Sequence, residues 1–240
     1  MNRGTLLLLP VSLSAASWVE WLPAHVRDIA CAINYFIVEN AKCARAEIAR
    51  LGHPQPIRNL SLSELPSAPT SADCDRLLAP AFSGHDVALM SDAGCPAVAD
   101  PGALLVRRCH ETGIRVRPLI GPSSLMLGLM ASGLEGQRFS FHGYLPARDP
   151  ERAIKIVALD KESARVSQTQ LFIETPYRNQ ALFKALLEHC QPKTRLCLAS
   201  DLTAPTESVM THRISEWRGM PTPQLDKRPT VFLMLADSRN

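Results

Sequence analysis

The chain has 240 residues, of which 46% are hydrophobic and 20% charged, and its formal net charge is +3. This length suits one large domain or two of roughly 100–150 residues, each able to bury a core. The ordinary composition excludes intrinsic disorder as the main theme. The mild positive charge neither indicates nor excludes binding to nucleic acid.

The seven cysteines form no C-x-x-C pair and are odd in number. This favours reduced, mostly buried thiols and a cytoplasmic protein without a metal site. Near the N-terminus, Arg3 and the run Leu6–Leu9 are compatible with a signal peptide or with a first buried strand. Pro10 interrupts the run, which favours the strand. The later apolar stretch Leu119–Leu134 is too short and too broken for a membrane span.

In the first half of the chain, short apolar runs alternate with helical stretches. The predicted strands are Thr5–Leu9, Tyr35–Val38, Val87–Met90 and Arg115–Leu119. The predicted helices are Ala24–Cys31, Ala41–Leu51, Ala72–Phe82 and Pro101–Thr112. The segment Ser61–Ser71, rich in serine and with two prolines, is expected to be an exposed loop. This alternation is typical of a mostly parallel sheet covered by helices.

After Gly121 the pattern changes. The predicted helices are Ser123–Ala131, Pro150–Ala164 and Tyr177–Cys190. The predicted strands are Arg138–His142, Gln170–Glu174, Arg195–Ser200, Ser208–Thr211 and Thr230–Leu235. Because consecutive strands without a helix between them favour antiparallel pairing, we expect a mixed sheet here. The sequence thus predicts an α/β fold of two domains, residues 1–119 and 120–240, with a ligand cleft between them.

The most informative motif is SDAGCPAVADPG, from Ser91 to Gly102, directly after the strand Val87–Met90. In open α/β sheets, ligands bind outside the carboxyl ends of strands, and small residues let the backbone approach them. The alternative is a plain strand–helix connection, with Asp100 as N-cap and Pro101 in the first turn. That alternative leaves Asp92 and the small residues unexplained.

Two further strands end in polar residues before a helix. The first is followed by Ile120-Gly121-Pro122-Ser123-Ser124. The exposed N–H groups of a helix start of this kind can hold polar ligand atoms, and the alternative is a helix start with no ligand. The second leads into Glu174-Thr175-Pro176-Tyr177-Arg178, where Tyr177 is suited to stack on a planar ring and Thr175 to cap the helix. Dinucleotide, phosphate-loop, zinc-protease and hydrolase signatures are missing from the sequence.

Taken together, these stretches resemble the tetrapyrrole methylase superfamily. They are most similar to the branch that 2′-O-methylates a cytidine of small-subunit ribosomal RNA, which typically reads S-D-A-G-T-P-x-I-S-D-P-G where this chain has Ser91–Gly102. Further matches in order are Ile120–Ser124, Ala131–Leu134, Phe139–Pro146, Phe172–Arg178 and Asp201–Glu207. The resemblance implies a two-domain, homodimeric methyltransferase that uses S-adenosylmethionine and acts on ribosomal RNA in the small subunit.

The chain departs from the family pattern near its N-terminus. The family's T-P-I-G-N becomes Leu9-Pro10-Val11-Ser12-Leu13, and its A-E-D-T-R retains only Glu39. Cofactor binding is therefore better supported than the ribosomal substrate. The cofactor-binding residues that the resemblance implies are Pro10, Ser91, Asp92, Ala93, Pro96, Ile120, Pro122, Ser123, Thr175 and Tyr177.

Candidate catalytic bases are Glu39 and Glu174, which lie at the ends of predicted strands; the alternative, which taken singly explains each of them better, is a carboxylate at a helix start. Candidate RNA contacts are Arg148, Arg152 and Lys155, although interleaved Asp149 and Glu151 are also compatible with a solvated helix surface. Two other functions stay open. One is methylation of a tetrapyrrole or another small molecule, and the other is a binding protein that keeps the cofactor pocket with weak or no catalysis.

Overall fold

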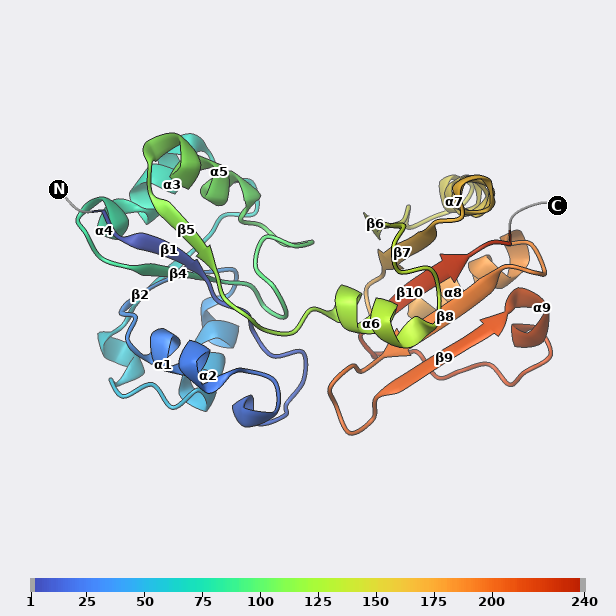
Figure 1. Cartoon of the computed structure of the whole chain (residues 1–240), viewed down its shortest axis with the longest axis horizontal. Helices are drawn as coiled ribbons and strands as arrows, with labels where there is room; N and C mark the ends of the chain where they lie inside the picture. The colour runs from blue at the N-terminus through green and yellow to red at the C-terminus, as the bar shows by residue number, and fades with distance from the viewer. Residues whose placement is uncertain (1–2, 238–240) are drawn as a thin grey trace. The chain divides into compact units, whose positions relative to one another are not determined.

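The computed structural model describes residues 3–237, which form two compact units that divide between Ser123 and Ser124 (Figure 1). The first unit has a five-stranded sheet in the order β3-β2-β4-β1-β5, and all its neighbouring strands are parallel. The strands are β1 Thr5–Leu8, β2 Tyr35–Val38, β3 Ser61–Glu64, β4 Val87–Met90 and β5 Arg115–Pro118. The predicted parallel sheet is confirmed.

Strand β3 corrects the prediction that 61–71 is a loop. Its sequence, SLSE, has one apolar residue and no buried side chain, so periodicity gives no strand signal. The strand exists because it pairs in parallel with β2 along its whole length at the edge of the sheet. Tertiary pairing thus overrides a weak local preference.

Helices cover both faces of this sheet, and each face has its own apolar core (Figure 1). They are α1 Ala24–Cys31, α2 Ala41–Arg50, α3 Ser71–Leu77, α4 Ala79–Phe82 and α5 Ala103–Thr112, with short 3₁₀ turns at Trp18–Glu20 and Ile57–Asn59. The predicted continuous helix 72–82 is broken at Leu78. Pro80 explains the break, because proline lacks an N–H group and its ring clashes with the carbonyl four residues earlier.

Helix α5 also begins later than predicted, at Ala103 rather than Pro101. Its N-cap is Gly102, with φ at 136°, a backbone conformation that side chains disfavour. A Cβ atom there would lie 2.9 Å from Leu89 Cδ2. The interpretation of Asp100 as the N-cap is therefore wrong, and its carboxylate is left for other contacts.

The second unit has a mixed sheet in the order β6-β7-β10-β8-β9. Strands β6 and β7 are parallel, and the other pairs are antiparallel, which confirms the predicted mixed sheet. The strands are β6 Phe139–Tyr144, β7 Thr169–Ile173, β8 Arg195–Ser200, β9 Ser208–Arg213 and β10 Thr230–Leu235. The helices are α6 Ser124–Ser132, α7 Glu151–Val166, α8 Asn179–His189 and α9 Ile214–Trp217.

Helices α7, α8 and α9 pack on one face of the second sheet, over a core that includes the stacked rings of Phe172 and Phe232. Helix α6 packs on the other face, where a Cβ atom at Gly128 would already lie 3.4 Å from Ala199 Cβ. The predicted α/β fold class is confirmed. Within residues 3–237, no helix is both long and apolar enough to cross a membrane.

Candidate functional site

The carboxyl edge of the first sheet gathers several motif segments, because β1, β4 and β5 are neighbours and run in the same direction. The chain leaves β1 at Leu9 and Pro10, β4 at Ser91, and β5 at Leu119 and Ile120. Backbone bonds continue past the strand ends, from Leu9 N to Leu89 O at 2.9 Å and from Leu119 N to Leu8 O at 3.0 Å. The three exit segments are therefore fixed side by side.

The exit segments also bond directly to one another. Val11 and Gly94 form an isolated antiparallel bridge, with N···O distances of 2.9 and 3.0 Å. The thiol of Cys95 donates to the carbonyl oxygen of Pro122 at 3.4 Å. Gly94 has φ at 72°, so the turn itself favours glycine. The motif after β4 thus contacts both the segment that follows β1 and the segment that follows β5.

Gly121 lies against Pro10 without room for a side chain. A Cβ atom at Gly121 would lie 2.3 Å from Pro10 Cβ and 2.6 Å from Pro10 Cγ. Among residues 3–237, neither Ile120 nor Gly121 forms a hydrogen bond, so their N–H groups are available to a ligand. This close, unpaired backbone is the feature expected of a cradle for a polar ligand.

The residues that follow β2 and β4 form a cluster of carboxylates. Glu39 Oε2 accepts a hydrogen bond from the backbone N–H of Asp92 at 3.2 Å. Ser91 is buried and donates from its hydroxyl to Ala93 O at 3.1 Å, whereas Asp92 and Ala93 are exposed. The exposed Asp92 carboxylate is therefore accessible to a ligand, and Ser91 serves the turn.

Asp100 joins this cluster, although its position in the sequence indicated only a helix N-cap. Burial and the nearby Glu39 raise the pKa of Asp100 to about 6, despite a hydrogen bond from Ser91 that opposes the rise. The loop that brings it there has two non-glycine residues in the left-handed region, Ala97 with φ at 64° and Ala99 with φ at 65°. The signal in the sequence was that the motif Ser91–Gly102 contains two aspartates, of which Asp100 is the second.

The pKa of Asp100 predicts a pH-dependent stability. Since its pKa is raised above the ordinary 3.8, the neutral form is favoured in the fold. The stability that neutral Asp100 contributes to the fold is fully present below about pH 4. It is lost as pH rises through about 6, because the carboxyl group then ionises in the folded protein. Asp100→Asn should therefore raise Tm above pH 6 and leave Tm unchanged near pH 4. The exposed Asp226→Asn is the control; parallel Tm–pH curves for wild type and D100N would contradict the assignment.

The divergent segment after Pro10 is tied to α2. Ser12 donates from its backbone N–H and its hydroxyl to the buried Glu47 carboxylate, at 3.3 and 3.1 Å. Arg50 completes the group, with 2.9 Å between its guanidinium and Glu47. The residues that replace the family's Gly-Asn pair are thus anchored in the first unit.

In the second unit, the segment after β7 forms a turn, and α8 begins at Asn179 rather than at the predicted Tyr177. Glu174 Oε1 accepts hydrogen bonds from Thr175 N at 2.6 Å and from the guanidinium of Arg178 at 2.6 and 3.0 Å. Thr175 does not cap α8, whose N-cap is Arg178 without a side-chain cap. Tyr177 is 76% exposed, so its ring is free to contact a ligand.

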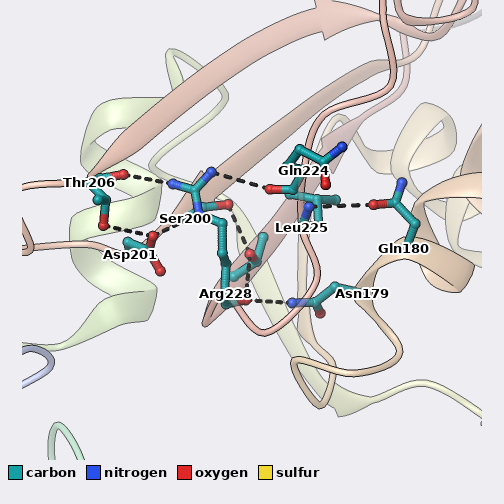
Figure 2. A network of polar contacts seen from close by, with 9 residues as sticks. Asn179, Gln180, Ser200, Asp201, Thr206, Gln224, Leu225 and Arg228 are labelled. Carbon is teal, nitrogen blue, oxygen red and sulfur yellow. Dashed lines mark hydrogen bonds and ion pairs between the residues drawn. The ribbon is translucent and has the colours of Figure 1, made fainter.

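Figure 2 shows a polar network that supports this turn. Arg228 pairs with Asp201 at 2.7 Å, and its carbonyl oxygen accepts from the buried Asn179 side chain at 2.7 Å. Next to it, Lys227 N donates to Pro176 O at 3.2 Å. The loop before β10 therefore fixes the turn that carries Thr175 and Tyr177.

The candidate RNA contacts lie before and within α7. Arg148 is exposed and forms no ion pair within the described residues. Arg152 pairs with Asp149 at 2.6 Å, and its side chain is only 15% exposed. Lys155 is half-buried on the same helix. Arg148 is thus the most available of the three charges. Within residues 3–237, no cluster of His, Cys, Asp and Glu is arranged to hold a metal.

Sequence comparison relates the chain to proteins named "Ribosomal RNA small subunit methyltransferase I". That of Vibrio cholerae serotype O1 is 38% identical over 151 residues, which are 63% of this chain and 47% of that protein. That of Xylella fastidiosa is 33% identical over 157 residues, or 65% and 54%. The matches thus span about half the length of these curated relatives. No family model matches the chain.

Solved structures share the fold across nearly the whole chain. The methyltransferase CobJ matches with a TM-score of 0.65 at 16% identity, over 97% of this chain and 94% of that chain. The uroporphyrin-III-C-methyltransferase of Thermus thermophilus matches with a TM-score of 0.56 at 19% identity, over 97% and 92%. A conserved hypothetical protein, APE0931 of Aeropyrum pernix K1, gives 0.69 at 14%, over 99% and 86%. At these identities the likeness shows the fold.

Proposed function

We propose, from the confirmed resemblance of the chain to the tetrapyrrole methylase superfamily, that it is an S-adenosylmethionine-dependent methyltransferase. The observation that carries the proposal is the carboxyl edge of the first sheet. There the segments after β1, β4 and β5 are bonded together around Gly121. The backbone N–H groups of Ile120 and Gly121 have no partner among residues 3–237. Such edges are where open α/β sheets bind ligands.

Bound S-adenosylmethionine supplies a methyl group on a positively charged sulfur. The charge on sulfur makes the methyl carbon an electrophile. In our proposal Asp92, Ala93 and Pro96 line one side of its site, while Ser91 shapes the turn beneath them. Pro10, Ile120, Pro122 and Ser123 line another side, and the available N–H groups hold polar atoms of the cofactor. From the second unit, the resemblance adds Thr175 and Tyr177 to the proposed cofactor contacts.

As substrate we propose a ribose 2′-hydroxyl of small-subunit ribosomal RNA. The names of the curated relatives support this choice, although the matches cover about half of their length. In-line attack needs a hydroxyl held against the methyl group, and positioning of this kind supplies roughly 7–11 kcal/mol of a barrier. A carboxylate that follows a strand, Glu39 in the first unit or Glu174 in the second, takes up the hydroxyl proton.

The test is methyl transfer from labelled S-adenosylmethionine to purified small ribosomal subunits, with mass spectrometry of the nucleosides. A 2′-O-methylated product would support the proposal. Transfer to a tetrapyrrole, and none to RNA, would favour the small-molecule function, of the kind named for the uroporphyrin-III-C-methyltransferase. Cofactor binding with no transfer to either substrate would favour the binding protein.

We also propose a cytoplasmic homodimer; a monomer by light scattering at micromolar concentration would contradict it.

Arg148 and Arg152 offer a prediction about RNA binding. Replacing both with alanine should weaken RNA binding. The slope of log K against log salt concentration should become shallower by about one to two, because each phosphate contact releases counterions. We expect the lower end of this range, since Asp149 already pairs with Arg152. Arg165→Ala is the control on the same helix, where Glu162 holds the guanidinium. An unchanged slope in the double variant would exclude these phosphate contacts.

A further inference from the structure

A cavity of about 560 Å³ lies at the amino edge of the first sheet. It is lined by the first residues of β1 and β5, by the end of α1 and by the loop before β4, including Thr5, Asn34, His85, Asp86, Arg115 and Arg117. The proposed cofactor site lies at the carboxyl edge, where the same strands end. The cavity is therefore separate from that site, and its volume is in the usual range for ligand pockets.

Two arginines dominate one wall of the cavity. Arg115 and Arg117 lie on β5, the edge strand, opposite Thr5 and Leu7 of β1. Because alternate residues of a strand face the same side, both side chains leave the sheet on one face, with Cα atoms roughly 6.6 Å apart. Both residues are exposed.

These arginines lack the carboxylate partners that other arginines have. Within residues 3–237, neither forms an ion pair or side-chain hydrogen bond, whereas the neighbouring Arg108 is held by Asp75 and Glu111. The carboxylate that lines the cavity is Asp86, and its Oδ1 already accepts from Thr5 N at 2.7 Å. The two guanidiniums are free to form bidentate bonds to a ligand.

The balance of charge in the cavity favours an anion. Two guanidiniums oppose one carboxylate, and the ring of His85 lies beside the ring of Tyr35, with 5.2 Å between centroids. Helix α1 ends here and contributes roughly half a negative charge. The net charge remains positive. Arginine forks match the oxygens of phosphate better than a point charge does.

We infer that this cavity is a second RNA contact, in which Arg115 and Arg117 bind phosphate groups of the strand that the enzyme methylates. The inference rests on the proposed function for its RNA source, and free phosphate shares the same chemistry. The alternative is that the two arginines only prevent β5 from pairing with the edge strand of another molecule, as charges on edge strands do.

The test compares Arg115→Ala/Arg117→Ala with Arg58→Ala/Arg107→Ala, which removes the same charge from exposed residues outside the cavity. The probes are a single-stranded RNA oligonucleotide and inorganic pyrophosphate, each titrated over a range of salt. For RNA we expect about tenfold weaker binding and a slope lower by roughly 1.4, the value for two contacts on a single strand. The control pair should change both quantities much less.

Cofactor affinity, measured by calorimetry on the same variants, separates this inference from the proposed function. If Arg115→Ala/Arg117→Ala binds RNA more weakly and keeps the wild-type affinity for the cofactor, the result supports an RNA contact. If RNA does not bind wild type while pyrophosphate binds through Arg115 and Arg117, the phosphate site stands and the RNA source fails. Equal effects of the two variant pairs, or no phosphate-dependent binding in either arm, would overturn the inference.

Discussion

Replacement of Gly121 by alanine is expected to weaken S-adenosylmethionine binding by at least about tenfold, or roughly 1.4 kcal/mol, and replacement by leucine to abolish detectable binding. The reason is steric. The first side-chain carbon would lie 2.3 Å from Pro10 Cβ, a distance that real contacts do not reach. Either the segment after β1 or the one after β5 must move, and both line the proposed site. Isothermal calorimetry measures the loss.

Gly136→Ala is the matched control, because a Cβ atom there meets no atom within 4 Å and its φ is not positive. Circular dichroism and thermal unfolding of G121A test whether the fold persists. A folded G121A protein with wild-type cofactor affinity would place the cofactor elsewhere. Leucine alone would not decide the question, since it is the variant more prone to unfold the unit.

The sequence predicts the first sheet well where strands are buried on both sides. Val87–Met90 and Tyr35–Val38 are short apolar runs, and both lie where periodicity places them. The prediction fails at Ser61–Glu64, whose polar residues become a strand only through pairing with β2. Edge strands of this kind depend on a neighbour that lies far away in the sequence.

The candidate site is predictable only in part, because position along the chain does not give the partner of a side chain. The motif letters locate Asp92 and Gly121 at strand ends, and the structure brings their segments together. They do not reveal that Asp100 lies near Glu39, because that contact needs the loop through Ala97 and Ala99. Left-handed alanines are not foreseen from sequence, since alanine prefers the right-handed region.

The same limit applies to the two candidate bases, which the sequence treats alike. Glu174 is buried and held by an ion pair: its side chain is 3% exposed, and Oε1 accepts from Thr175 N and twice from Arg178. Glu39 is half-buried and accepts a single bond, at Oε2 from Asp92 N, within the described residues. Its other oxygen is available to a substrate hydroxyl. We therefore propose Glu39 as the base and Glu174 as the residue that holds the turn.

Glu39→Gln is accordingly expected to lower kcat by about 10²–10⁴-fold, the usual contribution of a positioned base, with little change in the KM for S-adenosylmethionine. Glutamine keeps an oxygen that can accept from Asp92 N but cannot take up a proton. The variant also removes the charge that helps to raise the pKa of Asp100, so the pH at which stability is lost should move below about 6. This second readout is independent of turnover.

Glu174→Gln is the comparison variant. It breaks a charge-assisted pair with Arg178, so we expect a lower Tm and a raised KM for the cofactor before any large change in kcat. If E39Q retained wild-type kcat while its pH–stability curve shifted as expected, the carboxylate would lie at the edge of the sheet without acting as the base. If E174Q instead lost kcat alone, with Tm and KM unchanged, the roles of the two glutamates would be reversed.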